Sequence, residues 1–344
     1  MIDLLKTLVA ESSPSGFEKK SIDLFRNLIS PFVDDVQEDV LGNLICIKKG
    51  VNASKKLMLI AHVDEVAMMV KYIEESGCLR VVNVGGLDCS LLKGLNVFIH
   101  HEGKIVRGVV GSCPVHFRRF NNDIDMSELW IDIGALNRTE AENLVSIGDF
   151  VSFDSPFYEF PNEIVTSKSC DDKVGLAVLI QVLTNLSSVC FDYDLVVVAS
   201  VQEEVGARGA AVSSYSVSPD LCIAIDVTHA TDYPAVNKSV FGDVRLGAGP
   251  TIPFGTELAV PVQDKLKQVA QESNFNYQIE VLPNNSGTDI HSVQVSRCGC
   301  LTGLICVPCR YMHTPVEMVS MNDLKIASSI LTLFCKSDFM QKLK

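Results

Sequence analysis

The stretch LMLIAHVDE at residues 57–65 joins a wholly apolar run to a group of polar side chains. Short apolar runs of this kind are typical of strands buried on both faces, as in a parallel sheet covered by helices. Three further runs have the same character, at residues 195–201, 221–225 and 301–307. Helical patterns lie between them, at residues 172–186 and 259–273. The alternation predicts an α/β sheet sandwiched by helices.

The middle of the chain follows a different pattern. Short strand-like segments with glycine turns replace the apolar runs, for example LNVFIHHEGKIVRGVVGS at residues 95–112. Glycine punctuation at this spacing is typical of a small β-barrel or sandwich. We therefore expect a mixed, mostly parallel sheet sandwiched by helices, with a small inserted β-barrel. Residues 1–67 and 161–344 are the predicted catalytic sheet domain, and residues 68–160 are the predicted insert.

Composition restricts the classes of function. The 344 residues include 42 acidic and 29 basic side chains, and the resulting net charge of −13 disfavours binding to nucleic acid. No run of eighteen apolar residues is present, so no membrane-spanning helix is expected. The N-terminal residues lack the features of a secretory signal. Together with twelve scattered cysteines, these features predict reduced thiols and a cytoplasmic location.

Polar side chains that can bind metals stand at the ends of the predicted strands. The motif AHVDE follows the first strand, VQEEVGARG the second and CRYMHTPVE the fourth, while SCDDKVG opens a helix. Together with an aspartate that ends the third strand, they supply His62, Asp64, Asp171, Asp172, Glu203, Glu204, Asp226 and His313. Ligands of open α/β sheets bind at the carboxyl ends of the strands, so these side chains are expected to converge.

The residue types point to a particular chemistry. Two imidazoles and three carboxylates form a ligand set suited to zinc, cobalt or manganese. A carboxylate shared between two ions about 3.5–4 Å apart would give the arrangement of dinuclear hydrolases. Glu203 and Glu204 are adjacent on an extended segment, so their side chains point in opposite directions and one can stay free of the metal. The free carboxylate can move a proton from the attacking water to the departing amine.

Each motif also fits a structural role when it is taken alone. The histidines can be satisfied side chains of the core or surface, and Glu203 and Glu204 can belong to a solvated loop. Asp171 and Asp172 can cap a helix N-terminus. Asp226 is harder to explain in this way, because a lone buried carboxylate is costly. The presence of all five motifs, each at a strand end or a helix mouth, favours a single metal site.

The chain resembles the glutamyl/tetrahedral (TET) aminopeptidases, which are co-catalytic metallopeptidases of clan MH, in the motifs AHVDE, CDDKVG, VQEEVGARGA, AIDVT, SGTDIHSVQ and PCRYMHTPVE. The resemblance covers nearly the whole chain and includes VGGLD, GVVGSCPVH, LWIDIGA and SIGDFVSF in the insert. Departures from the family pattern occur at Val63, Ala67 and Lys173. Lys173 replaces the usual arginine, which keeps the charge and is expected to alter local hydrogen bonding. The resemblance implies an aminopeptidase that hydrolyses N-terminal residues from short peptides.

The same resemblance implies a role for each site residue. His62 and Asp226 would hold one metal ion, and Glu204 and His313 would hold the other. Asp171 would bridge the two ions. Glu203 would be the general base, and Asp64 would orient His62 by accepting its other ring N–H. The implied cofactors are two divalent metal ions, zinc or cobalt, with manganese as an alternative. The inserted domain is implied to form dimers, which assemble into a tetrahedral dodecamer.

Three other functions are compatible with parts of this pattern. Carboxypeptidases and deacylases of clan MH use nearly the same order of ligands, but the insert here falls between His62 and Asp171, which favours an aminopeptidase. An endoglucanase would need two carboxylates about 5–5.5 or about 6.5–9.5 Å apart around a sugar, and the neighbouring Glu203 and Glu204 are poorly placed for that. An inactive scaffold paralogue should lack a ligand or the base, and none is missing.

Overall fold

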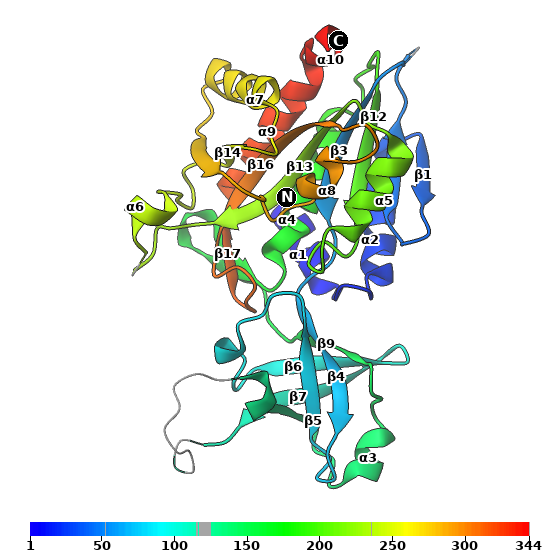
Figure 1. Ribbon diagram of the computed structural model, residues 1–344, viewed down its shortest axis with the longest axis vertical. Helices are drawn as coiled ribbons and strands as arrows, with labels where there is room; N and C mark the ends of the chain where they lie inside the picture. Colours follow the sequence, from blue (N-terminus) through cyan, green and yellow to red (C-terminus); the bar gives the residue numbers. More distant parts are fainter. Residues whose placement is uncertain (52, 115, 117–124, 235, 344) are drawn as a thin grey trace.

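The structure is a computed structural model that describes residues 1–51, 53–114, 116, 125–234 and 236–343. It contains a large mixed sheet covered by helices and, beside it, a closed antiparallel β-barrel (Figure 1). This architecture confirms the predicted fold class. Within the described ranges, no helix has both the length and the apolar character that crossing a bilayer requires.

The large sheet has parallel strands at its centre and antiparallel strands at its edges. The central strands, in spatial order, are β12 (Asp194–Ser200), β3 (Lys56–His62), β13 (Leu221–His229) and β16 (Leu301–Arg310). The flanking strands are β1 (Asp35–Glu38) and β2 (Leu44–Lys48) beside β12, and β17 (Glu317–Ser320), β11 (Ile164–Ser167) and β10 (Tyr158–Phe160) beside β16. Strand β14 (Thr251–Gly255) pairs with β16 and with β15 (Gln278–Leu282). The four central strands are the four apolar runs of the sequence.

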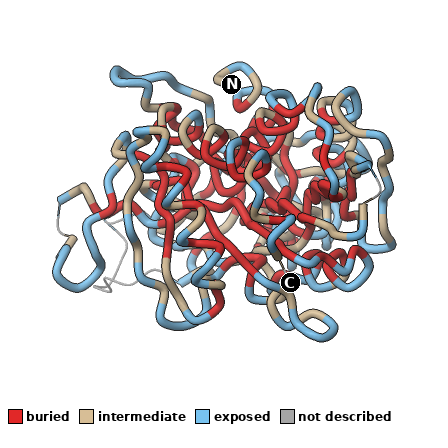
Figure 2. The backbone as a smooth tube through the Cα atoms, turned by 90° about the horizontal axis from the view of Figure 1, so that it is seen from above, coloured by how far each residue is buried: buried red, intermediate tan, exposed pale blue. Residues whose placement is uncertain are grey.

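Helices pack against both faces of this sheet. Leu57 and Leu59 of β3 belong to one buried cluster, and Met58 and Ile60 belong to the other, because successive side chains of a strand point to opposite faces. The first face is covered by α1 (Ile2–Ala10), α2 (Lys19–Ile29), α4 (Cys170–Asn185), α7 (Val260–Glu272), α9 (Met321–Lys336) and α10 (Phe339–Lys342), and the second by α5 (Arg208–Val217) and α8 (Ile290–Gln294). Each fully buried aliphatic side chain stabilises the fold by about 1.5–3 kcal/mol. Figure 2 shows these buried residues running through the interior, with exposed segments around them.

The barrel has a hydrophobic core of its own. Its strands, in order around the barrel, are β4 (Ala67–Ile73), β5 (Leu79–Val84), β8 (Leu129–Asp132), β7 (Lys104–Ser112), β6 (Asn96–His101) and β9 (Phe150–Phe153), and β9 pairs again with β4. Val70, Ile99 and Ile131 are among the side chains buried inside it. Two short helices lie outside these layers, α3 (Arg138–Glu142) and α6 (Lys238–Phe241). The division of the chain into a catalytic domain and an oligomerisation domain stays a prediction.

A short junction connects the sheet to the barrel. Residues 63–66 are all that separates β3 from β4. Ser13 fixes this junction from one side, because its Oγ donates to the Val63 carbonyl at 2.6 Å and its backbone N–H donates to Glu65 Oε1 at 2.8 Å. The Lys168 ammonium donates to the other Glu65 oxygen at 2.6 Å, and both side chains are buried. The junction is therefore held between the N-terminal segment and the segment before α4.

Strands β3 and β13 separate near their carboxyl ends. Their pairing ends at Ile60 and Ala224, whereas β13 continues to pair with β16 as far as His229. The prediction that Asp226 closes its strand is therefore wrong, because β16 keeps β13 in strand geometry for three further residues. Asp226 lies instead where β13 has parted from β3. This separation provides the space for the site.

Candidate metal centre

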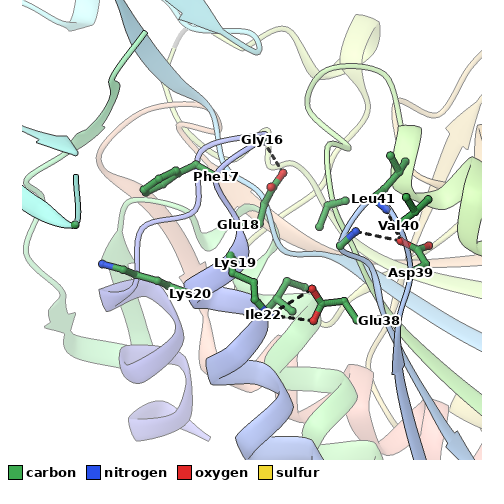
Figure 3. Close-up of a pocket in the computed structure, with 13 residues that line it drawn as sticks. Gly16, Phe17, Glu18, Lys19, Lys20, Ile22, Glu38, Asp39, Val40 and Leu41 are labelled. Carbon is green, nitrogen blue, oxygen red and sulfur yellow. Dashed lines mark hydrogen bonds and ion pairs between the residues drawn. The ribbon is translucent and has the colours of Figure 1, made fainter. Parts of the chain in front are cut away.

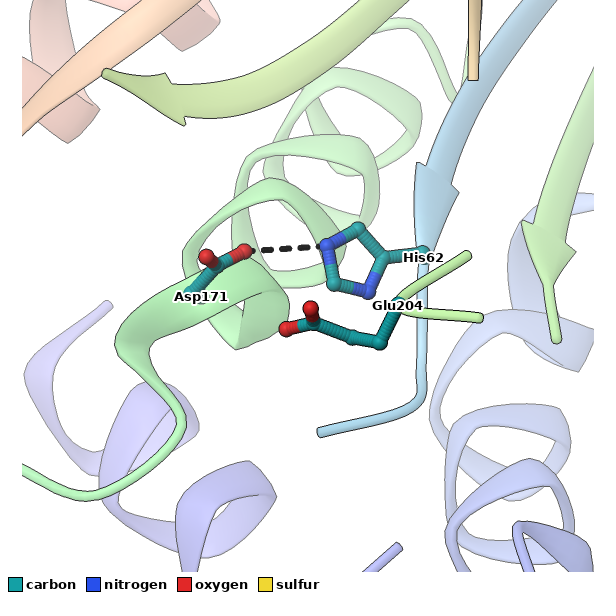
Figure 4. Close-up of side chains that lie close together, drawn as sticks. All are labelled: His62, Asp171 and Glu204. Atoms are coloured by element: carbon teal, nitrogen blue, oxygen red, sulfur yellow. Dashed lines mark hydrogen bonds and ion pairs between the residues drawn. The ribbon is translucent and has the colours of Figure 1, made fainter. Parts of the chain in front are cut away.

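The predicted metal ligands gather beside the point where β3 and β13 separate. His62 is the last residue of β3, Asp171 lies in the first turn of α4, and Glu204 lies in the loop after β12. One ligand atom from each of the three lies within 4.8 Å of the others. Figure 4 shows the Asp171 carboxylate directed at the His62 ring, with Glu204 reaching towards the same point from another segment.

Asp171 lies between the two predicted imidazole ligands. Its Oδ1 is 2.9 Å from His62 Nε2, and its Oδ2 is 3.3 Å from His313 Nε2. On the His313 side, Glu204 Oε2 is 3.3 Å from the same Nε2. On the His62 side, Asp226 Oδ1 is 4.0 Å from His62 Nε2. Asp171 is thus close to both imidazoles, with Asp226 near His62 and Glu204 near His313, although His313 belongs to neither group of three ligand atoms that lie within 4.8 Å of one another in the described part of the chain.

Asp172 joins the His62 side of the cluster, a position that the sequence analysis did not assign to it. Its carboxylate lies with His62 and Asp226 in a second group of ligand atoms within 4.8 Å of one another. Both aspartates at the start of α4 have non-helical backbone angles, and the peptide bond between them is cis. Asp172 Oδ1 accepts the Gly175 N–H at 2.9 Å, which caps the regular part of the helix.

Burial makes the cluster unfavourable for negative charge. It raises the pKa of Glu203 to about 9, although His62 opposes the shift, and the neighbouring Asp226 adds to it. Burial also raises the pKa of Glu204 well above its ordinary value, and Asp171 adds to that shift. At Asp171 the hydrogen bonds from His313 and His62 outweigh burial, so its pKa lies below the ordinary range. The cluster therefore lacks the positive charge that so many buried carboxylates need.

These residues fit divalent metal ions. Glu204 Oε1 is buried and has no hydrogen-bond partner among the described residues, and the same is true of Asp172 Oδ2. Buried carboxylate oxygens without donors are rare in folded proteins, and a bound cation is one of the few ways to satisfy them. The imidazole nitrogens and carboxylate oxygens that lie within 4.8 Å of one another here are of the types that zinc, cobalt and manganese accept as ligands.

Asp64 connects His62 to the pair of glutamates. Its Oδ1 lies 3.6 Å from His62 Nδ1, and its own carbonyl oxygen is closer to that nitrogen, at 3.1 Å. Its carboxylate also accepts the backbone N–H groups of Glu203 at 2.9 Å and Glu204 at 3.1 Å, and the Ser15 hydroxyl at 2.7 Å. The hydrogen bond from His62 to the Asp64 carboxylate stays a prediction, because the Asp64 carbonyl oxygen is the nearer acceptor, and the contacts with the glutamate backbone and with Ser15 were not predicted.

Glu317 also belongs to the site, although no role was predicted for it from the sequence. It is the last residue of the motif CRYMHTPVE and is 1% exposed. Its carboxylate accepts the backbone N–H of Asp171 at 2.9 Å and that of His313 at 2.8 Å. Its place in a motif that carries a predicted ligand was the only signal available in the sequence.

Two hollows lie near these residues. One of about 470 Å³ opens beside Glu203 and Glu204 and is bounded on its other side by Thr288 and His291. Another of about 590 Å³ lies between residues 16–20 and 38–42 and is lined by none of the predicted ligands (Figure 3). Because a substrate must reach the predicted ligands, the hollow beside the glutamates is the one relevant to catalysis.

Comparison with known proteins identifies the family. The family model described as M42 glutamyl aminopeptidase matches residues 42–330. The lysyl aminopeptidase of Pyrococcus furiosus is 33% identical over 347 residues, which cover 98% of each chain. The structure of aminopeptidase APDkam598 from Desulfurococcus kamchatkensis superposes with a TM-score of 0.93 at 36% identity, covering 100% of this chain and 97% of that one.

A third match concerns a peptidase with a known assembly. The Pyrococcus horikoshii TET1 peptidase, which can assemble into a tetrahedron or a large octahedral shell, superposes with a TM-score of 0.86 at 30% identity, covering 96% of this chain and 98% of that one. The resemblance to the glutamyl and TET aminopeptidases is confirmed by these matches. This chain is an aminopeptidase and belongs to the M42 glutamyl aminopeptidase family.

Proposed function

We propose that this aminopeptidase removes N-terminal residues from short peptides with two divalent metal ions and Glu203 as the general base. The observation that carries the proposal is the position of Asp171, whose two carboxylate oxygens face one imidazole each, at 2.9 and 3.3 Å. The ligands of the two ions are His62 with Asp226 and His313 with Glu204, and Asp171 is common to both. The chemistry that such ions supply when bound is the acidification of water and the polarisation of the scissile carbonyl.

Glu203 is the residue that moves the proton. It lines the hollow beside Glu204. Its backbone N–H is fixed by Asp64, so its position is coupled to that of His62. From there its carboxylate takes a proton from the attacking water and passes it to the departing amine. Asp64 acts through its neighbours, since it holds His62 and the backbone of both glutamates.

The metal ions and the assembly are inferred from separate observations. Imidazole and carboxylate ligands favour zinc or cobalt, with manganese as an alternative. We infer that residues 68–160 mediate assembly into a homo-oligomer, with a tetrahedral dodecamer built from dimers as the expected form. The similarity to the Pyrococcus horikoshii TET1 peptidase, which can assemble into a tetrahedron, supports this form. We place the protein in the cytoplasm, which agrees with twelve cysteines scattered along the chain rather than grouped in a disulfide framework.

The proposal is tested with the wild-type enzyme and the variant Glu203→Gln. A strong chelator should abolish the hydrolysis of aminoacyl chromogenic substrates, and zinc or cobalt should restore it. Glu203→Gln should bind the same number of ions as the wild type but turn over about 10²-fold more slowly, which is the scale of a lost general base. Glu163→Gln, which removes a surface carboxylate paired with Lys325, is the control and should be fully active.

Two results would contradict the proposal. Wild-type turnover by Glu203→Gln would remove this residue from the mechanism. Efficient cleavage of N-acetylated peptides would show that a free amine is not required, and would favour the related carboxypeptidase or deacylase chemistry.

A further inference from the structure

The carboxylate of Glu317 is buried between the two segments that carry Asp171 and His313. Its Oε2 accepts the Asp171 N–H at 2.9 Å, and its Oε1 accepts the His313 N–H at 2.8 Å. One side chain thus fixes the backbone of the shared carboxylate ligand and of one imidazole ligand. Glu317 itself belongs to neither group of ligand atoms found in the described part of the chain.

The backbone of both segments needs such an acceptor. Asp171 lies in the first turn of α4, where N–H groups have no partner within the helix. Ser169 just before it has φ of 51°, and His313 has φ of 61°, so both segments pass through the left-handed region. This conformation costs a residue other than glycine about 1–3 kcal/mol and persists only when the surroundings hold it. A side chain with two acceptor oxygens can satisfy one N–H group from each segment.

Strand pairing on both sides of β17 fixes the position of Glu317 relative to the strands that precede Asp171 and His313. Strand β17 begins at Glu317 and lies between β11 and β16. Strand β11 leads into α4 and Asp171, and β16 leads to His313. Glu317 is paired with Ser167 of β11, and the next residues of β17 are paired with Arg310 and Cys309 of β16. The side chain therefore stands between the two strands whose ends deliver the ligands.

We propose that Glu317 is a positioning residue, which holds Asp171 and His313 at the separation that two bound ions require. The inference rests on the proposed dinuclear site. Glu317 contacts His313 and the shared Asp171 but neither His62 nor Asp226, so the ion held by His313 and Glu204 depends on it more strongly. Residues that hydrogen-bond to metal ligands without contacting the metal typically contribute about 10- to 100-fold to metal affinity.

The test compares Glu317→Gln with a matched control, Asp323→Asn. Glutamine keeps the size of the side chain, but its amide group can accept only one of the two N–H groups and places a donor against the other. Asp323 is also fully buried and also accepts two backbone N–H groups, from Gly247 at 2.7 Å and Gly249 at 2.8 Å, but it lies outside both ligand groups. Asp323→Asn therefore reports the cost of disturbing a buried carboxylate without disturbing the metal centre.

Two metal-binding constants are measured for each full-length variant by competition with a chelator, and thermal unfolding is recorded without metal. In Glu317→Gln we expect one constant to weaken by about 10- to 100-fold and the other by less. The visible absorption spectrum of the cobalt-loaded variant should also change. Asp323→Asn should lose stability and keep both wild-type constants. If Glu317→Gln does not fold, Glu317→Asp, whose shorter side chain cannot reach both N–H groups, is measured in its place with the same expectation.

The outcomes separate this inference from the proposed function. Wild-type protein that binds fewer than two ions would refute both. Wild-type protein that binds two ions, with unchanged constants and cobalt spectrum in the Glu317 variant, would overturn the positioning role alone. A variant that loses only stability, as expected for Asp323→Asn, would show that Glu317 has a purely structural role.

Discussion

Metal binding to the ion-free protein at pH 7 is expected to release protons, and Glu203 should supply one of them. Burial raises the pKa of this residue from 4.5 to about 9. At pH 7 its carboxyl group is then mostly protonated, and ionising it in the ion-free protein costs on the order of 6 kcal/mol more than in water, at about 1.36 kcal/mol per pH unit. Two divalent ions beside it would supply the missing positive charge and make ionisation favourable.

The proton count is obtained by isothermal titration calorimetry in buffers with different enthalpies of ionisation. The wild type should release about one proton more than Glu203→Gln, because glutamine has none to lose. The metal affinity of the wild type should also rise with pH more steeply, by about one additional factor of ten per pH unit. The control Glu163→Gln changes a surface carboxylate and should match the wild type. Equal proton release by the wild type and Glu203→Gln would refute this account of the electrostatics.

The same pKa shift links stability to pH in the ion-free protein. The folded pKa of Glu203 lies above the unfolded value, so between pH 4.5 and about 9 the folded state binds a proton that the unfolded state does not. The contribution of Glu203 to the free energy of unfolding is therefore complete below pH 4.5 and is lost as the pH rises. The loss is about 3 kcal/mol at pH 7 and about 6 kcal/mol above pH 9. Thermal unfolding at several pH values should show this decline, and bound ions should remove most of it.

Two further substitutions test a buried hydrogen-bonding residue beside the site and the proposed bridging ligand. Lys173→Met removes a buried ammonium that donates to Ser13 Oγ at 2.7 Å, Ser21 Oγ at 2.6 Å and the Val63 carbonyl at 2.9 Å, and it should lower the free energy of unfolding by about 3 kcal/mol or more. A change below about 1 kcal/mol in urea unfolding would show that these bonds contribute little. Asp171→Ala removes the shared carboxylate and should abolish binding of both ions in equilibrium dialysis. Occupancy by two ions in that variant would exclude a bridging role.

The fold could be predicted because its signals are local. Strands β3, β12, β13 and β16 are apolar on both faces, so their sequences stand out without knowledge of their neighbours. The ends of a strand depend on its pairing with neighbouring strands, and these strands can lie far away in the sequence. The third apolar strand was predicted to end at Asp226, but it continues because β16 pairs with it as far as His229.

The side chains that gather beside β3 and β13 could be singled out as candidates from the sequence, whereas most of the hydrogen bonds that hold their backbone could not. A histidine or carboxylate at a strand end is visible in the sequence as a candidate ligand. The contacts of Asp64 with Glu203 and of Glu317 with Asp171 join positions 139 and 146 residues apart. In each case the acceptor meets a backbone N–H, which every residue except proline has, so residue types carry no trace of the pairing.

The junction between sheet and barrel has two structural roles. The same few residues connect the barrel to the sheet and include Asp64, which accepts the backbone N–H groups of Glu203 and Glu204. Lys168 and the N-terminal segment hydrogen-bond to this junction, so the attachment of the barrel and the backbone of the glutamate loop depend on the same few residues.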